Sequence, residues 1–257
     1  MEYKIFERTN LIINYSVVAR DDGIRFLADV SGRDSIAALI KILDRHPNSL
    51  VIPSIIELGC EYGNKSQYGE VYESLKGIFN RERVRIEQGI VCDGNELWKA
   101  IVERENEKVG KRFGFLSPCI ACHLALHIIR IKIARRLGIG NVVSGEKELH
   151  DGREKINQLS FVLDFYNRIY ESMGIAHHLP VRQISSTREI EKILRKYDPK
   201  YVRLKCTFEG NYYKKGTNEL AITKDRIQEY VDVDLADTLE ESGNMIDVQC
   251  SILGRIC

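Results

Sequence analysis

Short apolar runs alternate with helical patterns along most of the chain, and this alternation limits the fold more than any other feature. Strand-like runs lie at 24–30, 50–58, 83–91 and 141–144. Helical patterns lie at 34–43, 66–79, 95–108, 119–137, 153–173 and 187–197. Strands that alternate with helices of this length are typical of βαβ units. The sequence therefore predicts an α/β fold with an open, mostly parallel sheet, helices on both faces and a smaller C-terminal helical extension.

The pattern changes after Pro180, where charged and polar residues become more frequent. The stretch 228–247 contains acidic residues but no Lys or Arg, so it either pairs with basic residues across a homodimer or forms a solvated helix. We predict an N-terminal segment at 1–22, a main domain at 23–180 and a C-terminal region at 181–257 that supplies substrate or dimer contacts.

Composition narrows the class of protein. The chain has 257 residues, of which 44% are hydrophobic and 29% charged, and its net charge is +1. The hydrophobic content excludes a disordered chain. The net charge is too small to create an overall electrostatic field that would attract nucleic acid or a membrane surface. No apolar run approaches the ~18 residues that a membrane helix needs, and the charged N-terminal residues do not resemble a signal peptide. With seven scattered cysteines, the sequence predicts a cytoplasmic protein whose thiols serve metals, clusters or catalysis rather than disulfides.

Residues 28–35, with the sequence ADVSGRDS, form the sharpest local motif and join the first strand to the first helix. Gly32 permits a tight turn, and a helix start binds phosphate through its unpaired N–H groups and positive dipole end. Arg33 adds a guanidinium that can clamp a phosphate. Taken alone, the loop is explained equally well as an ordinary capped βα turn. The candidate nucleotide-binding residues are Ala28, Ser31, Gly32, Arg33, Asp34 and Ser35.

Cys119 and Cys122 open an apolar helix with the CxxC spacing. Two thiols at a helix start point toward one spot, and the helix dipole favours the thiolate, so the pair suits a soft metal or redox chemistry better than chance packing. A structural zinc needs four ligands, and the sequence has no second CxxC. Cys206 is the remaining candidate, although taken alone it is better explained by packing. Cys60 and Cys92 end apolar strands and are expected to be small buried hydrophobes.

The loop resembles the PP-loop of the ATP pyrophosphatases, which belong to the HUP class of nucleotide-binding domains. The family motif is Ser-Gly-Gly-x-Asp-Ser/Thr after the first strand. The residues from Gly32 to Ser35 match it from the second Gly onward. Ser31 stands either in place of the first Gly or, if one Gly is deleted, in place of the family Ser. The main domain is therefore expected to be a HUP-type PP-loop domain.

The cysteines extend the resemblance to the tRNA 2-thiolation branch of that family. There, too, a CxxC opens an Arg-rich helix, and an Ala-x-x-x-Gly segment, a strand, a Gly-containing turn and a third Cys follow. This chain has them in the same order over about residues 24–210. It departs from the branch at 145–151, where the turn is longer and reordered, and it has no Cys before Cys60 that could form the zinc ribbon of several such enzymes.

The resemblance implies an enzyme that uses ATP and Mg²⁺, releases AMP and pyrophosphate, adenylates a substrate oxygen and replaces it with sulfur. It implies that Asp34 holds Mg-pyrophosphate. It also implies that Cys119, Cys122 and Cys206 hold a 4Fe–4S cluster with one iron open to sulfur, or that one of them carries a persulfide. These four residues are the expected catalytic set. The expected substrate is tRNA or an anionic small molecule, and the sulfur donor is not predicted.

A second polar group follows the strand at 141–144. Ser144, Gly145 and Arg153 are candidate cofactor contacts and Asp151 a candidate Mg²⁺ ligand, because open α/β sheets bind ligands outside the carboxyl ends of their strands. A solvated loop with a helix cap is the alternative. The pair 177–178, two His residues, is expected to be a turn feature.

Two basic groups, at 111–140 and 192–205, would attract an anionic substrate if they rim the cysteines, although a solvated face explains either group alone. Tyr212 and Tyr213 are candidates for stacking on a base. Two other functions remain open. One is an AMP-forming ligase or amidase with structural zinc on the cysteines. The other is a non-enzymatic, redox-responsive nucleotide-binding protein.

Overall fold

A computed structural model describes residues 23–79, 84–114, 118–235 and 249–252. Within them, seven strands form one sheet and two more form a short antiparallel ribbon. The strands of the sheet are β1 (Arg25–Asp29), β2 (Leu50–Glu57), β4 (Arg85–Ile86), β5 (Ile90–Asp93), β6 (Asn141–Val143), β7 (Ala176–His178) and β9 (Gln249–Ile252). The ribbon consists of β3 (Glu61–Tyr62) and β8 (Lys205–Cys206).

The sheet is open and mostly parallel. Its strands follow the order β7-β6-β1-β2-β5-β9, and β4 also pairs with β2. Among the described strands of this seven-stranded sheet, only the β5–β9 pair is antiparallel. The carboxyl ends of β1, β2, β5, β6 and β7 therefore meet at one edge. The predicted α/β class is confirmed.

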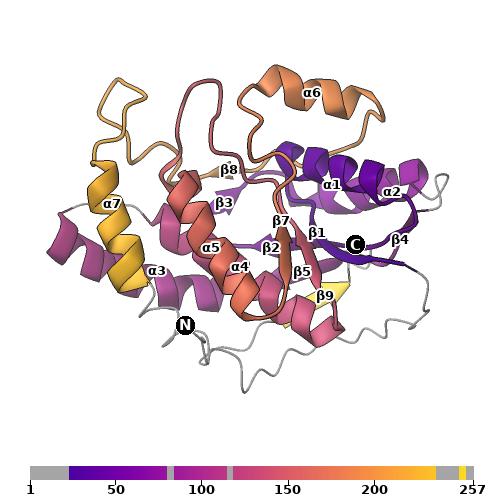
Figure 1. The fold of residues 1–257 in the computed structure, drawn as a ribbon, viewed down its shortest axis with the longest axis horizontal. Coiled ribbons are helices and arrows are strands. Elements are labelled where there is room, and N and C mark those ends of the chain that lie inside the picture. The colour runs from indigo at the N-terminus through magenta and orange to yellow at the C-terminus, as the bar shows by residue number, and fades with distance from the viewer. Residues whose placement is uncertain (1–22, 80–83, 115–117, 236–248, 253–257) are drawn as a thin grey trace.

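Helices cover both faces of the sheet. They are α1 (Arg33–Arg45), α2 (Tyr68–Phe79), α3 (Asn95–Phe113), α4 (Cys119–Leu137), α5 (Ser160–Ser172), α6 (Thr187–Arg195) and α7 (Lys224–Tyr230), with short turns η1 (Lys65–Gln67), η2 (Ile156–Gln158) and the π-helical η3 (Val231–Leu235). One hydrophobic core contains side chains of α3, α4, α5 and α7, and the other contains those of α1, α2 and α6 (Figure 1). In β1, Leu27 belongs to the first core, whereas Phe26 and Ala28 belong to the second. This is the alternation that a strand buried on both faces requires.

The single strand expected at 83–91 is divided into β4 and β5, and both pair with β2 on either side of Pro53. Leu50 and Val51 pair with β4, whereas the pairing with β5 begins at Ser54. Pro53 lies in the gap between the two partners. Because proline has no N–H to donate, it is tolerated in this inner strand where the neighbouring strand is interrupted.

Two other expectations are corrected. The pair His177–His178 belongs to β7, which pairs in parallel with β6, so it is not a turn. The helix expected at 153–173 begins at Ser160, after the short turn η2. In contrast, α4 spans the expected 119–137.

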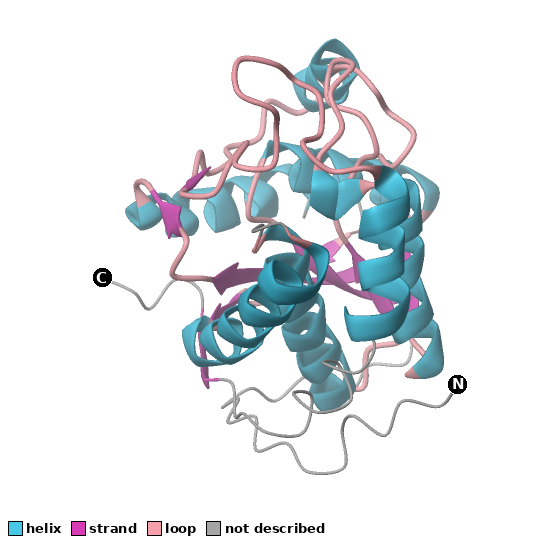
Figure 2. Cartoon of the chain, turned by 90° about the vertical axis from the view of Figure 1, so that its left-hand side faces the viewer, coloured by secondary structure: helices cyan, strands magenta, loops and turns pink. Residues whose placement is uncertain are grey.

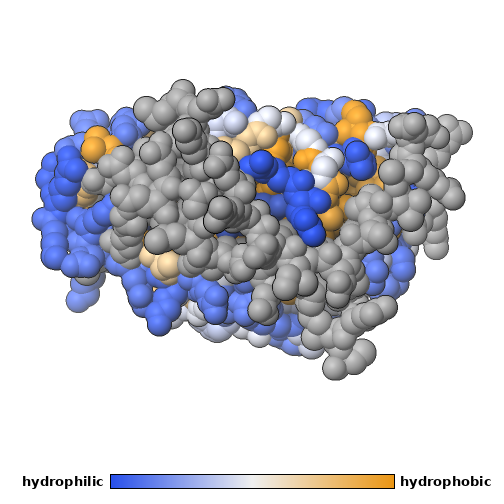
Figure 3. Space-filling view, turned by 90° about the horizontal axis from the view of Figure 1, so that it is seen from below, coloured by the Kyte–Doolittle hydropathy of each residue, from blue (hydrophilic) through white to orange (hydrophobic). Residues whose placement is uncertain are grey.

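The loops that follow the parallel strands gather at one end of the molecule, at the top of Figure 2, together with α6. Figure 3 shows the opposite end, where hydrophilic side chains dominate among the described residues in view. No helix among these residues is long and apolar enough to cross a membrane. The expected segment 1–22, residues 236–247 of the acidic stretch and Cys257 lie outside the described residues.

Candidate functional site

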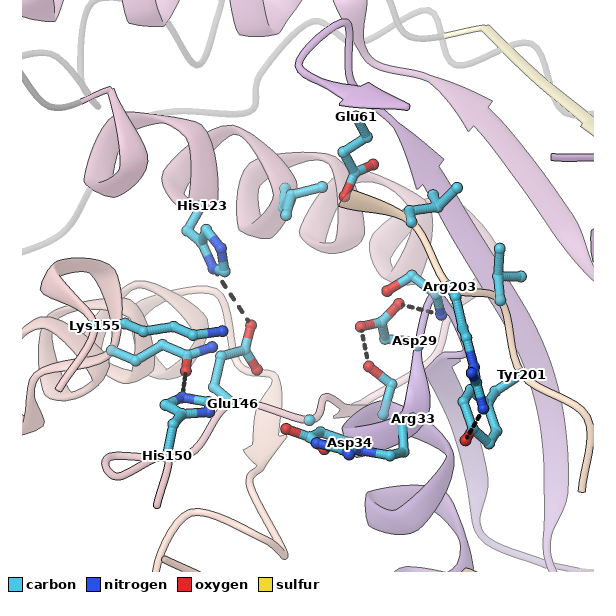
Figure 4. A pocket seen from close by; sticks show the side chains of 18 of the residues that line it. Asp29, Arg33, Asp34, Glu61, His123, Glu146, His150, Lys155, Tyr201 and Arg203 are labelled. Carbon is cyan, nitrogen blue, oxygen red and sulfur yellow. Dashed lines mark hydrogen bonds and ion pairs between the residues drawn. The ribbon is translucent and has the colours of Figure 1, made fainter. Parts of the chain in front are cut away.

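A cavity of about 680 Å³ opens at the carboxyl edge of the sheet. Asp29 ends β1, Glu61 lies just beyond β2, and Glu146 follows β6, so three neighbouring strands deliver carboxylates to it. Figure 4 shows His123, Lys155 and Glu146 on one side of the cavity and Tyr201 and Arg203 on the other. The position agrees with the rule that open α/β sheets bind ligands outside the carboxyl ends of their strands.

The predicted phosphate loop lines this cavity, and Asp29 fixes its shape. The backbone N–H of Ser31 donates to Asp29 Oδ1 at 3.1 Å, and Ser35 Oγ donates to Asp29 Oδ2 at 2.7 Å. Gly32 caps α1 in an extended conformation without a side-chain cap. The first N–H groups of α1 therefore face a cavity that can hold an anion.

Charges of both signs surround the start of α1. Arg33 Nε donates to Asp34 Oδ1 at 3.1 Å, and Lys147 Nζ lies 3.5 Å from Asp34 Oδ2. Lys147 is fully buried, and its ammonium has no hydrogen-bond partner. Asp34 is therefore the counter-ion of a buried cation as well as a member of the loop.

Gly145 lines the cavity, but a different contact explains why it is glycine. A Cβ at this position would lie 2.3 Å from the backbone N of Ser35 and 2.5 Å from the backbone carbonyl carbon of Asp34. Since real Cβ atoms do not approach so closely, only glycine lets the loop after β6 pack on the start of α1.

Several predicted contacts do not face the cavity. Ser144 is fully buried, with its Oγ 2.6 Å from His177 Nε2, and Ala28 is buried within β1. Arg153 is exposed, and its Nε donates to the carbonyl of His150 at 3.4 Å. None of the three lines the cavity as the structure has it.

Asp151 is not placed as a Mg²⁺ ligand. Its carboxylate accepts from the backbone N–H of Thr187 at 2.7 Å and from Thr187 Oγ1 at 2.6 Å, at the start of α6. These bonds lower the pKa of Asp151. His150, next to it, lines the cavity instead, and burial lowers its pKa to about 4.

A buried polar cluster lies beneath the cavity. It includes His123, His127 and Arg130 of α4 and Glu146 of the loop after β6. Arg130 Nη2 lies 3.0 Å from Asp29 Oδ2, and its Nη1 lies 3.7 Å from Glu146 Oε1. Burial alone would lower the pKa of Arg130, but the two carboxylates raise it overall. Burial likewise lowers the pKa of His123 to about 4 and that of His127 well below its ordinary value, so both imidazoles are neutral at neutral pH.

A second cavity, of about 220 Å³, contains the cysteines. Cys119, Cys122 and Cys206 all line it, so the chain brings the three predicted positions to one place. The route to Cys206 is the β3–β8 ribbon, in which Cys206 pairs with Glu61.

Cys60, which the sequence predicts to be a small buried hydrophobe, is buried and also lines this cavity. Its Sγ lies 3.6 Å from Cys122 Sγ. The hydrogen bond with Cys122 raises the pKa of the Cys60 thiol above its ordinary value, and the bond with Cys60 does the same for Cys206. These two thiols are therefore protonated at neutral pH until a metal displaces the protons.

The expected basic rim at 111–140 is not formed. Arg130 and Lys132 are buried within α4. Arg135 and Arg136 are in the last turn of α4. At a rise of about 1.5 Å per residue, this is roughly 24 Å from Cys119. From the second group, Arg203 lines the large cavity, and its Nη2 donates to Tyr201 Oη at 3.2 Å.

The two tyrosines proposed to stack on a base are engaged inside the protein. Tyr212 is buried, and Tyr213 Oη donates to the carbonyl of Glu154 at 2.7 Å.

Several side chains that line or adjoin the two cavities belong to none of the site motifs that the sequence predicts. They are Asp29, Cys60, Glu61, His123, Arg130, Glu146, Lys147 and Lys155. One signal was available, because three of them lie at or just beyond the carboxyl ends of predicted strands. His123 and Arg130, which lie within α4, had no such signal in the sequence.

Two solved structures are similar to this chain at low identity. One is U34-tRNA thiolase NcsA from Methanococcus maripaludis with its 4Fe–4S cluster, at 14% identity and a TM-score of 0.44, with 88% of this chain and 71% of that chain covered. The other is a predicted subunit of tRNA methyltransferase from Methanocaldococcus jannaschii, at 13% identity and a TM-score of 0.39, with 88% and 93% covered. Both TM-scores lie below 0.5, so neither structure supports a conclusion about this chain.

Curated sequences give a firmer relationship, although no family model matches the chain. The uncharacterized protein MJ0009 of Methanocaldococcus jannaschii is 31% identical over 204 residues, which are 76% of this chain and 72% of that protein. Identity at this level over most of both chains establishes that this chain belongs to the same family as MJ0009.

Proposed function

We propose that the protein is an ATP-dependent sulfurtransferase that forms AMP and pyrophosphate. The observation that carries the proposal is that the phosphate-loop cavity and the cysteine cavity adjoin. They share the lining residues Glu61, His123, Leu126, Lys155, Gln158 and Leu204. A group activated in the larger cavity is therefore beside the thiols.

The larger cavity suits a nucleotide. Its volume of about 680 Å³ falls in the range of small-molecule sites. The start of α1, from Gly32 onward, offers N–H groups to the β- and γ-phosphates, and Arg33 adds a guanidinium. Asp34 would hold Mg²⁺ on these phosphates, with carboxylate oxygen as the ligand that Mg²⁺ prefers.

The chemistry begins when a substrate oxygen attacks the α-phosphorus of ATP. The bond to the bridging oxygen breaks, pyrophosphate leaves, and the substrate oxygen becomes part of an AMP ester. Arg33 and Lys155 line the cavity where negative charge develops on the phosphates, so they stabilise the transition state. Burial lowers the pKa of Lys155. Attack by sulfur at the activated carbon then releases AMP.

The donor set of the smaller cavity fits a 4Fe–4S cluster. Zinc bound by four thiolates at about 2.3 Å holds their sulfurs roughly 3.8 Å apart. Cys119, Cys122 and Cys206 all line this cavity, and they are the ligands that we propose for the cluster. Cys60 Sγ lies 3.6 Å from Cys122 Sγ, close to the spacing that zinc requires, so zinc held by these four thiolates is the alternative. When bound, the 4Fe–4S cluster supplies an iron with an open position for sulfide.

Two elements of the fold bring the thiols to the smaller cavity. Cys119 and Cys122 begin α4, and the ribbon brings Cys206 to them from the other side. Phe208 and Tyr212 line the cavity beside the thiols and limit access of water. For the substrate, we propose an anionic molecule, with tRNA as the first candidate, because Arg203 and Lys205 lie at the two cavities.

The test is anaerobic purification of the full chain, followed by assays of pyrophosphate release and of thiolated nucleosides in tRNA by mass spectrometry. A brown, iron-containing protein that releases pyrophosphate with tRNA and restores a thionucleoside to tRNA from a deletion strain supports the proposal. A colourless zinc protein that joins two substrates with AMP release overturns it in favour of a ligase. ATP binding without pyrophosphate release, under any redox condition, overturns it in favour of a sensor.

A further inference from the structure

We propose that His123, His127 and Glu146 form a second metal site, for a divalent first-row transition ion, whose ligands include none of the cysteine thiols. His123 and His127 are one turn apart on α4, and Glu146 follows β6. Glu146 Oε1 lies 3.4 Å from His127 Nε2 and 3.9 Å from His123 Nδ1. The three ligand atoms lie within 4.8 Å of one another, and no other such group occurs among the described residues.

The three side chains present unsatisfied atoms to one point. His123 Nδ1, His127 Nε2 and Glu146 Oε2 are buried and have no hydrogen-bond partner in the part of the chain that the structure describes. The side chain of His127 is 0% exposed and that of Glu146 5% exposed. Because buried polar atoms nearly always find a partner, three orphaned atoms together indicate a bound group. Two imidazole nitrogens that face a carboxylate match a metal ion better than any other occupant.

The surroundings of His127 prepare it as a ligand. Its other nitrogen, Nδ1, lies 3.2 Å from Tyr170 Oη. A proton on Nδ1 that is donated to this oxygen leaves the lone pair of Nε2 free. Metal-ligating histidines use their second nitrogen in this way. The ring of Tyr170 in turn stacks on His177 at 4.1 Å between centroids, which fixes its position.

The charges nearby admit a divalent ion. Asp29 and Glu146 are anions, and Arg130 lies between them, 3.0 Å from Asp29 Oδ2 and 3.7 Å from Glu146 Oε1. Lys155 adds a second cation at the cavity. A bound divalent ion would leave the cluster positive and so attract an anionic ligand from the large cavity, which His123 and Glu146 line.

The donor set also identifies the class of metal. Two imidazoles and one carboxylate favour zinc or ferrous iron with open positions, rather than Mg²⁺, which prefers oxygen ligands. No thiol belongs to the group. Its occupancy therefore does not depend on the cysteines.

Titration with Co²⁺ tests the site in full-length protein that carries Cys119→Ser and Cys122→Ser, which removes the two thiolates of α4. We expect one equivalent of Co²⁺ with weak d–d bands. His123→Ala or Glu146→Gln in this background should weaken binding at least about 100-fold, since outer-shell partners alone contribute roughly 10–100-fold. Tyr170→Phe should weaken Co²⁺ binding roughly 10-fold or more, because it removes the hydroxyl that orients His127. His46→Gln, outside the cavity, is the matched control and should bind normally.

Zinc content of otherwise unmodified protein, after dialysis against Zn²⁺ alone, covers the case in which the cysteine variant does not fold. His123→Ala should retain one zinc per chain fewer than His46→Gln, and anaerobic dialysis against Fe²⁺ identifies the preferred ion. The proposal is overturned if His123→Ala and Glu146→Gln bind as tightly as His46→Gln, or if the protein takes up no Co²⁺ at millimolar concentration. Neither readout involves ATP or sulfur transfer.

Discussion

The sulfur of Cys60 lies 3.6 Å from the sulfur of Cys122, although the two residues are 62 positions apart in the chain. The contact places a fourth thiol beside the three that the CxxC motif and Cys206 supply. Whether Cys60 binds the cluster or only positions Cys122, the site contains more sulfur than the sequence motif suggests.

Cys60→Ser is therefore expected to lower the iron content of anaerobically purified protein by more than half, as Ser substitutions of Cys119, Cys122 and Cys206 should. A hydroxyl is a poor ligand for iron and does not replace the contact with Cys122. Iron and acid-labile sulfide per chain are the measurements. Ile90→Val is the control, because Ile90 is buried in β5 and does not line the cavity. Unchanged iron in Cys60→Ser would show that the thiol only packs there.

Asp34→Ala should reduce pyrophosphate release at least about 100-fold, the scale of losing a preorganised charge at a transition state. It should also lower the free energy of unfolding by about 3 kcal/mol, since the buried ammonium of Lys147 loses its counter-ion. The double variant with Lys147→Met should recover stability but not activity. Asp44→Ala, at the exposed end of the same helix, should leave pyrophosphate release unchanged. Normal release by Asp34→Ala would remove the PP-loop interpretation.

Gly145→Ala should destabilise the protein by about 1–3 kcal/mol, the cost of forcing a methyl group into packed backbone. The new Cβ would lie 2.3 Å from the backbone N of Ser35, so the phosphate loop must move and ATP binding should weaken. Gly140→Ala is the matched control, because nothing lies within 4 Å of its Cβ position. Urea unfolding and nucleotide titration of both variants make the comparison, and equal stability would contradict the close approach.

Glu61 should make stability depend on pH. Burial, reinforced by Asp29, raises its pKa from 4.5 to about 7. Between these values the folded protein binds a proton that the unfolded chain releases, so this group makes stability fall as pH rises. Other groups titrate in the same range, and the test is therefore the difference between wild type and Glu61→Gln. Urea unfolding near both ends of this interval should show the variant losing less stability on going to the higher pH.

Glu73→Gln serves as the control for that experiment, because its carboxylate is 68% exposed on α2. It should follow the wild-type curve. If Glu61→Gln followed it too, the carboxyl of Glu61 would be solvated rather than buried.

The sequence could predict the elements that rest on periodicity and the motifs that rest on short spacing. The apolar run and CxxC that define α4 and the loop before α1 are local, so their positions follow from local chemistry. Pro53 argued against an inner strand, and only the interruption between β4 and β5 explains its place. Cys60 and Lys147 could not be assigned, because their partners are brought to them by the topology rather than by neighbouring residues.

The ribbon of β3 and β8 also determines how late in synthesis the cysteine cavity can form. Thr207 donates its backbone N–H and its hydroxyl to the carbonyl of Cys60, at 2.8 and 2.6 Å, beside the pairing of Glu61 with Cys206. Chains fold as they are synthesised, N-terminal parts first. A growing chain that has reached Gly145 already holds the complete phosphate loop and the glycine that packs on it, whereas the sulfur cavity waits for residues around 206. Synthesis thus completes the phosphate loop and its contact with Gly145 first, whereas both cavities close only when Tyr201, Arg203 and Cys206 have been made.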